Sequence, residues 1–246
     1  MEVHHHSHHP KKWKEYITEF IMLFAAVTLG FFAENQREHY IEGLRETQYM
    51  ESLLEDLSRD KFDVNESIKF TTTQIAYYDT AIALLSENNW TRDNVKKLYR
   101  ASLKLGGSRP TTFVDRTSSQ LRAGGMRIIR NKKVATLLAE YWQRIDQLND
   151  FEAVTLNVYK QNIRGMLYKV FDGKNYIDVK NKVINEEAVL MTYDRNYLTE
   201  LNNRLLDTRY NLDKFILQFF YKECNSLIVD IQTAIVEDYK ISASDK

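Results

Sequence analysis

The sequence is poor in residues that interrupt helices and in residues that build disulfide or zinc sites. Its 246 residues include only two prolines, eight glycines and one cysteine, Cys224. Because a sandwich of short strands needs a turn about every ten residues, this scarcity of proline and glycine favours long helices. The single cysteine excludes an internal disulfide framework and a cysteine-based zinc site, and we expect it to be a small apolar core residue.

The chain also lacks net charge. Lysine plus arginine and aspartate plus glutamate both number 34, so no overall field attracts nucleic acid, and we expect no nucleic-acid partner. The hydrophobic fraction of 43% is large enough for a folded core. Composition therefore favours an all-α protein whose electrostatic partners, if any, bind locally.

Signatures of common active sites are absent from the sequence too. It has no phosphate-binding glycine loop, no paired histidines around a glutamate, no serine elbow and no cysteine pair. His39 is the only histidine beyond the amino-terminal tail. Carboxylates such as Asp56 and Asp60 alternate with basic residues, as on a solvated helix face. We therefore expect no enzymatic activity.

One long apolar run is present near the amino terminus. Residues 20–33 carry no charge, and extension back to Trp13 gives about twenty positions, enough for a helix to span the ~30 Å hydrocarbon core of a bilayer. In the predicted membrane anchor, Trp13 and Tyr16 are interfacial aromatics, and Glu19 can reach headgroups or bond within an oligomer. The other anchor residues are Phe20, Leu23, Phe24, Gly30 and Phe31.

A cleavable export signal and a buried core helix are the alternatives to an anchor. Signal cleavage needs small residues before the cut, whereas this run ends with the bulky Phe31 and Phe32 before Ala33. A core helix does not need the lysine and aromatic residues that flank the start of the run. The sequence therefore favours a permanent anchor.

The charges that flank the apolar run predict its orientation. Lys11, Lys12 and Lys14 precede it, and Arg37 and Arg45 follow it, which favours a cytoplasmic amino terminus at the inner membrane and a periplasmic bulk of the chain. The predicted parts are a histidine-rich cytoplasmic tail over residues 1–12, a transmembrane helix over 13–33, an extracytoplasmic helical domain over 34–240 and a frayed end over 241–246.

The tail contains the tract "HHHSHH". Several imidazoles together can bind a divalent metal ion, and this is the one cofactor that the sequence suggests. A flexible tract has no fixed coordination geometry and no supporting shell, so a solvated tail is the competing interpretation, and the tract can also be part of an affinity tag. The residues concerned are His4, His5, His6, His8 and His9.

Two stretches carry a resemblance to a known family. "KKWKEYITEFIMLFAAVTLGFFAENQREHYIEGLRETQYMESLLEDL", which follows the histidine-rich start, and "RTSSQLRAGGMRIIRNKKVATLLAEYW" resemble an uncharacterised family of small single-pass membrane proteins common in Bacteroidota. The resemblance covers about the first sixty residues and the middle motif. It implies an inner-membrane protein with a helical extracytoplasmic domain, and it implies no activity.

Apolar spacings of three and four predict helices along the rest of the chain. We expect the anchor to continue as a stalk through Ile68 and a second helix to end near residue 88. Antiparallel packing of three or four helices then buries the stripes. The fold predicted is thus an amino-terminal transmembrane helix that continues into an elongated antiparallel helical bundle. Further expectations are a short helix capped by Thr91, a loop over 105–113, a short helix over 117–122, a helix from Asn131 through Val170, a turn over 172–175, a short helix or irregular crossover over 176–193 and a long helix over 198–235.

The middle motif is the best candidate for a specific site. Arginines surround small hydroxyl residues and a glycine pair, an arrangement that can form an anion pocket from guanidinium groups and backbone amides. The competing interpretation is a tight corner between helices, with the arginines facing water or acidic neighbours. The residues are Arg116, Ser118, Arg122, Gly124, Gly125, Arg127 and Arg130.

An aromatic cluster near the carboxyl terminus is wider than one helix stripe. Phe215, Phe219, Phe220 and Tyr221 lie within seven residues. Because a broad apolar helix surface must be covered by more protein, this cluster indicates an interface.

Two functions of different classes fit these patterns. The first is a non-enzymatic structural or accessory subunit of a cell-envelope membrane complex. It oligomerises or docks through helix stripes and through a transmembrane face on which Ala25, Ala26 and Gly30 permit close approach. The second is an extracytoplasmic sensor that binds an anion at the arginine-rich corner and signals through a partner. The expected partners are the lipid bilayer and other protein subunits, including further copies of this chain.

Overall fold

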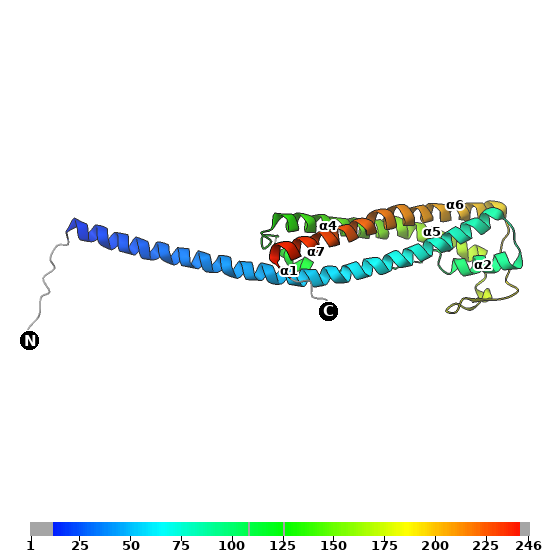
Figure 1. Cartoon of the computed structure of the whole chain (residues 1–246). Helices are drawn as coiled ribbons and strands as arrows, with labels where there is room; N and C mark the ends of the chain where they lie inside the picture. The colour runs from blue at the N-terminus through cyan, green and yellow to red at the C-terminus, as the bar shows by residue number, and fades with distance from the viewer. Residues whose placement is uncertain (1–11, 108, 125, 242–246) are drawn as a thin grey trace, which may run out of the picture. The chain divides into compact units, whose positions relative to one another are not determined.

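The protein is almost entirely helical (Figure 1). The computed structural model describes residues 12–107, 109–124 and 126–241, and the chain divides into two compact units, one ending at Tyr49 and one beginning at Met50. In the second unit three helical rods form an elongated bundle, and the described residues form a single sheet of two short strands. The predicted all-α class is confirmed.

Helix α1 runs without a break from Trp13 to Glu87, over 75 residues. No proline and only two glycines lie within this range, so nothing in the sequence forces the helix to end. Asn88, with a positive φ of 51°, lies directly after its last turn. The expected division into a stalk and a second helix is wrong, because the apolar stripes before and after Ile68 belong to one helix.

The other two rods each contain a π-helical segment in the middle. Asn131 begins the second rod as predicted, since its Oδ1 accepts hydrogen bonds from the amides of Lys133 and Val134. The predicted continuation of this helix through Val170 is also confirmed. The second rod consists of α4 (Lys132–Asp150), η1 (Phe151–Leu156) and α5 (Asn157–Val170), and the third of α6 (Arg195–Asn211), η3 (Leu212–Tyr221) and α7 (Lys222–Tyr239).

Side-chain contacts fix the directions of the rods. Gln232 donates to Ser58, whereas Asn202 donates to Ser86, so the third rod is antiparallel to α1. The third rod is also antiparallel to the second, because Asn131 at the start of α4 contacts Asp238 near the end of α7. The first and second rods therefore run parallel, and a connection must return the chain along α1 between them.

Short elements complete the bundle. Thr91 caps α2 (Arg92–Ser102) as predicted, with its Oγ1 accepting from the amide of Asn94 at 3.2 Å. Gly124 ends α3 (Arg116–Ala123).

The stretch expected as a short helix or crossover instead contains a β-hairpin, because valine and isoleucine alternate there with polar residues. Its parts are η2 (Gly173–Asn175), β1 (Tyr176–Asp178) and β2 (Val183–Ile184), with Tyr176 opposite Ile184 and Asp178 opposite Val183.

The returning connection, residues 103–107 and 109–115, lies along α1 and is called the strap. Five buried side chains of α1 bond to the strap or to the start of α3, at spacings of four, seven, seven and four residues. Such spacings place all five on one face of the helix. These residues, the polar ladder, are Asp56, Asp60, Ser67, Gln74 and Tyr78.

The start of the strap bonds to the carboxyl-terminal end of the ladder. Gln74 Nε2 donates to the carbonyl oxygens of Lys104 and Gly107, at 3.0 and 2.8 Å, and Tyr78 Oη accepts from the amide of Gly106 at 3.1 Å. Gly106 has a positive φ of 69°, a conformation that side chains rarely adopt. The ladder thereby satisfies backbone groups that have no helix or sheet partner.

The end of the strap bonds to the other end of the ladder. Thr111 donates to Ser67 at 3.0 Å, and Asp60 Oδ1 accepts from the amide of Val114 at 2.7 Å. Asp56 and Asp60 are only 2% exposed. Their expected place on a solvated face is therefore wrong, because the strap covers the polar side of α1.

Asp60 makes the stability of the bundle depend on pH. Burial raises the pKa of its carboxyl to about 6, and the nearby Asp56 and Asp63 add to the shift, although bonds from Val114 and from the hydroxyl of Tyr141 oppose it. Because the folded chain binds this proton more tightly than the unfolded chain, the stabilisation is complete below the ordinary pKa and is lost as pH rises through about 6.

Asp60→Asn should remove this pH dependence, because the amide carries no charge; its oxygen can accept from the amide of Val114, and its NH2 group can donate to the hydroxyl oxygen of Tyr141. Measured by urea unfolding of the full chain in mild detergent, the free energy of unfolding of the variant minus that of the wild type should rise by up to about 2 kcal/mol from pH 4 to pH 7. If the difference in unfolding free energy between the variant and the wild type stays constant with pH, the raised pKa of Asp60 is contradicted.

Candidate functional site

The predicted anchor lies in the first unit, at the start of α1. Among the described residues, α1 is the one helix long and apolar enough to cross a membrane, judged by length and composition, and none of its most apolar window is buried. A core helix of a soluble protein would be mostly buried. The exposed predicted anchor residues are Trp13, Tyr16, Glu19, Phe20, Leu23, Phe24, Gly30 and Phe31.

Two threonines of the predicted anchor bond to the backbone of the helix itself. Thr18 Oγ1 donates to the carbonyl of Lys14 at 2.9 Å, and Thr28 Oγ1 donates to the carbonyl of Phe24 at 2.8 Å. A segment in contact with hydrocarbon must satisfy its polar groups internally. The threonines therefore add little cost to burial of this segment in lipid.

At the arginine-rich corner, Arg116 lies against carboxylates of α1. Its Nη2 is 2.7 Å from Asp56 Oδ1 and 3.5 Å from Glu55 Oε2. The second oxygen of Asp56 accepts from the amide of Thr117 at 3.1 Å. Asp56 thus holds both a guanidinium group and the first turn of α3, so the charge of Arg116 is largely balanced inside the protein.

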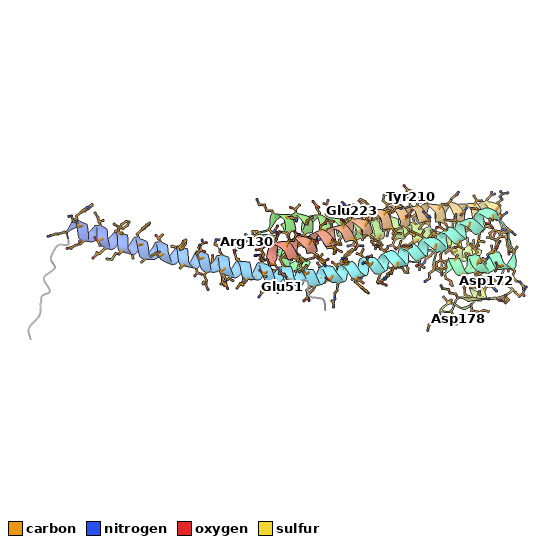
Figure 2. The ribbon with its side chains drawn as sticks, in the orientation of Figure 1. Glu51, Arg130, Asp172, Asp178, Tyr210 and Glu223 are labelled. Atoms are coloured by element: carbon orange, nitrogen blue, oxygen red, sulfur yellow. The ribbon has the colours of Figure 1, made fainter. Side chains whose placement is uncertain are left out.

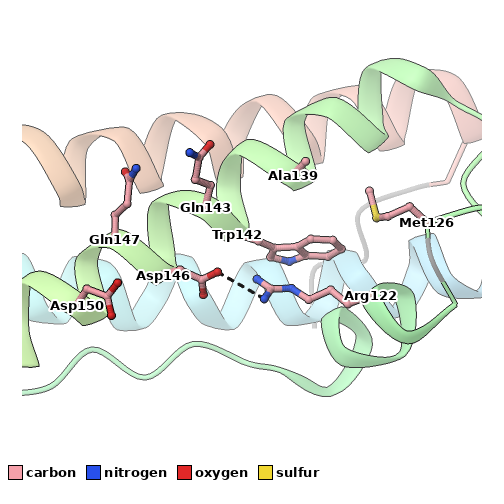
Figure 3. A pocket seen from close by; sticks show the side chains of 8 residues that line it. All are labelled: Arg122, Met126, Ala139, Trp142, Gln143, Asp146, Gln147 and Asp150. Atoms are coloured by element: carbon pink, nitrogen blue, oxygen red, sulfur yellow. Dashed lines mark ion pairs between the residues drawn. The ribbon is translucent and has the colours of Figure 1, made fainter.

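Arg122 and Ser118 also have partners within the corner. The guanidinium group of Arg122 lies 4.8 Å from the centre of the Trp142 ring and 3.6 Å from Asp146 Oδ2 (Figure 3). Ser118, which is buried, accepts a hydrogen bond from Trp142 Nε1 at 3.0 Å. These contacts fasten α3 to α4.

The remaining corner residues do not converge on one point. Gly124 closes α3, and a Cβ there would approach Ile128 to 3.4 Å, so glycine permits a close turn. Arg127 and Arg130 are exposed. Among the described residues Arg127 has no ion pair, whereas Arg130 has a partner. Gly125 lies outside the described residues.

An open groove of about 550 Å³ lies beside the corner, along the outer face of α4 (Figure 3). Arg122 is its one basic residue, and Asp146 and Asp150 are acidic. An anion in the groove would therefore meet two carboxylates, which disfavours binding. This geometry favours the interpretation of the motif as a tight corner with arginines facing acidic neighbours. The other lining residues are Met126, Ala139, Trp142, Gln143 and Gln147.

The histidine tract, His4 to His9, lies outside the described residues. In the part of the chain that the structure does describe, no group of three or more histidine, cysteine, aspartate or glutamate side chains is placed to hold a metal ion. The suggested metal site stays a prediction about the tail alone.

An exposed apolar stripe follows the third rod. It consists of Leu206, Tyr210, Phe215 and Phe219, with exposed fractions between 39% and 54%. The steps are four, five and four residues, and the five-residue step falls at the entry to η3. Because a π-helical turn takes more residues than an α-helical turn, the insertion keeps Phe215 on the same face as Tyr210.

A second apolar stripe on η1 and α5 meets the first. Phe151 lies 5.4 Å from Phe215 between ring centres, and Phe215 lies 6.2 Å from Tyr210. Val154 and Val158, three and seven residues after Phe151, are more than half exposed. We call the two stripes together the side patch; its residues are Phe151, Val154, Val158, Leu206, Tyr210, Phe215 and Phe219.

Sequence reasoning identified half of the aromatic cluster correctly as surface. Phe215 and Phe219 are partly exposed, whereas Phe220 and Tyr221 are buried. Leu206, Tyr210, Val154 and Val158 were missed. The five-residue step from Tyr210 to Phe215 is the signal that could have joined them to the cluster, but it fits neither of the regular helical spacings used to find stripes.

Comparison with protein-family models, with curated proteins and with solved structures finds no match for this chain.

Cys224 should be chemically silent in the folded protein. It is fully buried, and burial raises the pKa of its thiol to about 12. A reagent therefore cannot reach the sulfur, and the reactive thiolate form is not populated at neutral pH. A maleimide should fail to label the native wild-type chain at pH 7 and should label it after denaturation. Rapid labelling of the native chain would contradict the buried position of α7.

Proposed function

We propose that the protein is a non-enzymatic, single-pass membrane protein that acts as a structural or accessory subunit of a cell-envelope membrane complex. The side patch is the observation that carries this proposal. Six large apolar side chains are partly or largely exposed on two neighbouring rods, and monomeric proteins rarely leave such patches uncovered. Stripes on paired helices match a docking mode in which the apolar face of a further helix packs against both.

The apolar start of α1 supports the membrane part of the proposal. Its exposed phenylalanines and leucines need a nonpolar environment, and hydrocarbon provides one over the whole length of a spanning helix. The excess of lysine before the run supports a cytoplasmic amino terminus at the inner membrane and a periplasmic second unit. A sensor function receives less support, because Arg116 and Arg122 lie against carboxylates of the same chain.

Anchoring and orientation can be tested together with cysteine variants, since Cys224 should not react. The chain should stay with the membrane during alkaline carbonate extraction. In intact spheroplasts a membrane-impermeant maleimide should label Thr73→Cys, an exposed position of α1 outside the side patch and the hairpin, and it should label Ser7→Cys only after permeabilisation. Release by carbonate rejects the anchor, and the reverse labelling pattern rejects the orientation.

The docking role of the side patch can be tested by photo-crosslinking in native membranes. A photoreactive phenylalanine in place of Phe215 or Phe219 should give a product of one defined larger mass, containing either a second copy or another subunit. The same group in place of Phe62, an exposed aromatic of α1 outside the patch, should not. Equal products from both surfaces would reject the proposal.

Substitutions within the side patch test how much it contributes to the affinity of the association. Leu206→Ser combined with Tyr210→Ser should weaken the association at least about tenfold in mild detergent, because each buried large apolar side chain contributes about 1.5–3 kcal/mol. Phe62→Ser is the control and should have no effect. The circular dichroism melting curves should be measured for both, so that loss of folding is distinguished from loss of docking.

A further inference from the structure

The β-hairpin carries a second set of exposed apolar side chains, separate from the side patch. Ile177 and Val179 are at least 60% exposed, and Val183 is 46% exposed. Figure 2 shows the hairpin, labelled at Asp178, standing away from the rods of the second unit. Ile177 and Val179 share one face of the hairpin, whereas Val183, paired with Asp178, lies on the other. Branched aliphatic side chains exposed on a projecting hairpin are costly in water, so they indicate a surface that becomes covered.

The base of the hairpin is held firmly, so the exposure is not that of a loosely attached loop. Tyr99 of α2 is the centre of this attachment. Its hydroxyl donates to the carbonyl of Val189 at 2.8 Å and accepts from the amide of Asp172 and from Asn175 Nδ2, at 3.0 and 2.9 Å. Its ring packs 5.1 Å from that of Tyr176. The polar groups at the base are thus used within the fold, and the tip presents its apolar side chains.

Residues 172–183 contain three lysines, Lys174, Lys180 and Lys182, and two aspartates, so positive charge is in slight excess around the tip. Within the part of the chain that the structure describes, Lys174 and Lys180 have no ion pair. Asp178 keeps its negative charge, because the amide and side chain of Asn181, which donate to it at 2.9 and 2.7 Å, are neutral groups. The acidic residues of the following segment are neutralised by α2. Their ion pairs are Glu186 with Lys96 and Glu187 with Arg92.

We propose that the hairpin, through Ile177, Val179 and Val183, with Lys174 near its base and Lys180 in its turn, docks onto an anionic lipid surface. Aliphatic side chains that enter the interfacial layer, with lysines at headgroup level, are the chemistry by which proteins lie on membranes. A protein strand added to the hairpin is a weaker fit, because β1 has three residues and offers few backbone bonds. The contact is additional to the anchor and to the side patch.

The test uses the full chain reconstituted into phosphatidylcholine vesicles, and so rests on the proposed anchor. Dye-labelled target vesicles are made of phosphatidylcholine alone or of phosphatidylcholine mixed with phosphatidylglycerol. The wild-type chain should capture the mixed vesicles. Ile177→Ser with Val179→Ser should reduce this capture about tenfold, because apolar area at the contact is lost. Lys174→Gln with Lys180→Gln should remove the preference for phosphatidylglycerol.

The matched control is Phe62→Ser, which removes exposed apolar surface from α1 outside both the hairpin and the side patch and should leave capture unchanged. A second readout is an environment-sensitive dye on Asn181→Cys, whose emission should shift to the blue when mixed vesicles are added. The proposal is overturned if the dye emission does not shift, or if capture is equal in the hairpin and control variants. Either result is also expected if a protein, and not lipid, covers the tip. Failure of the anchor is distinguishable, because the chain would not enter the first vesicles.

Discussion

The fold depends on a polar face of α1 that is buried rather than solvated. Two parallel rods can follow one another in the chain only if a connection returns along their length, and most of this connection is neither helix nor strand. Buried backbone groups in such a segment must find partners. The ladder from Asp56 to Tyr78 provides them, so the side chains of one helix take the role that a neighbouring strand has in a sheet.

The two π-helical segments decide which aromatic side chains lie on the surface of the second and third rods. Phe151 at the start of η1 contacts both Phe215 and Phe220 of η3, at 5.4 and 5.5 Å between ring centres. Each insertion changes the angular position of every residue that follows it. One aromatic residue, Phe220, thereby turns into the core, while Phe215 stays on the exterior. Core packing and surface presentation are decided by the same local change of helical period.

Sequence reasoning recovered the elements that have local signals. The caps Thr91 and Asn131, the loop before α3 and the long stripes of the second and third rods each depend on residues close together in the chain. The corner at Arg116 and Arg122 was located, but sequence could not decide between an anion pocket and paired arginines, since the carboxylates of Asp56 and Asp146 come from other helices.

Other features were missed because their signal is not local. Asp60 and Ser67 look like surface residues in a pattern that separates apolar from polar positions, and only the strap makes them interior. The β-hairpin was missed because its strands have three and two residues, below the length at which alternation is informative. The side patch depends on a change of helical period. A search for stripes at spacings of three and four assumes that this period is constant.

The route of the chain also sets the order in which the bundle can assemble during synthesis. Bonds from α1 to the strap and to the start of α3 join residues 28 to 61 positions apart, whereas the third rod bonds to α1 across 116 to 174 positions. A nascent chain can therefore close the polar side of α1 early, whereas the contact of Ser58 with Gln232 forms only after α7 has left the ribosome. A product truncated before Lys222 would leave the surface of α1 that α7 covers exposed, and quality-control proteases could recognise it as incompletely folded.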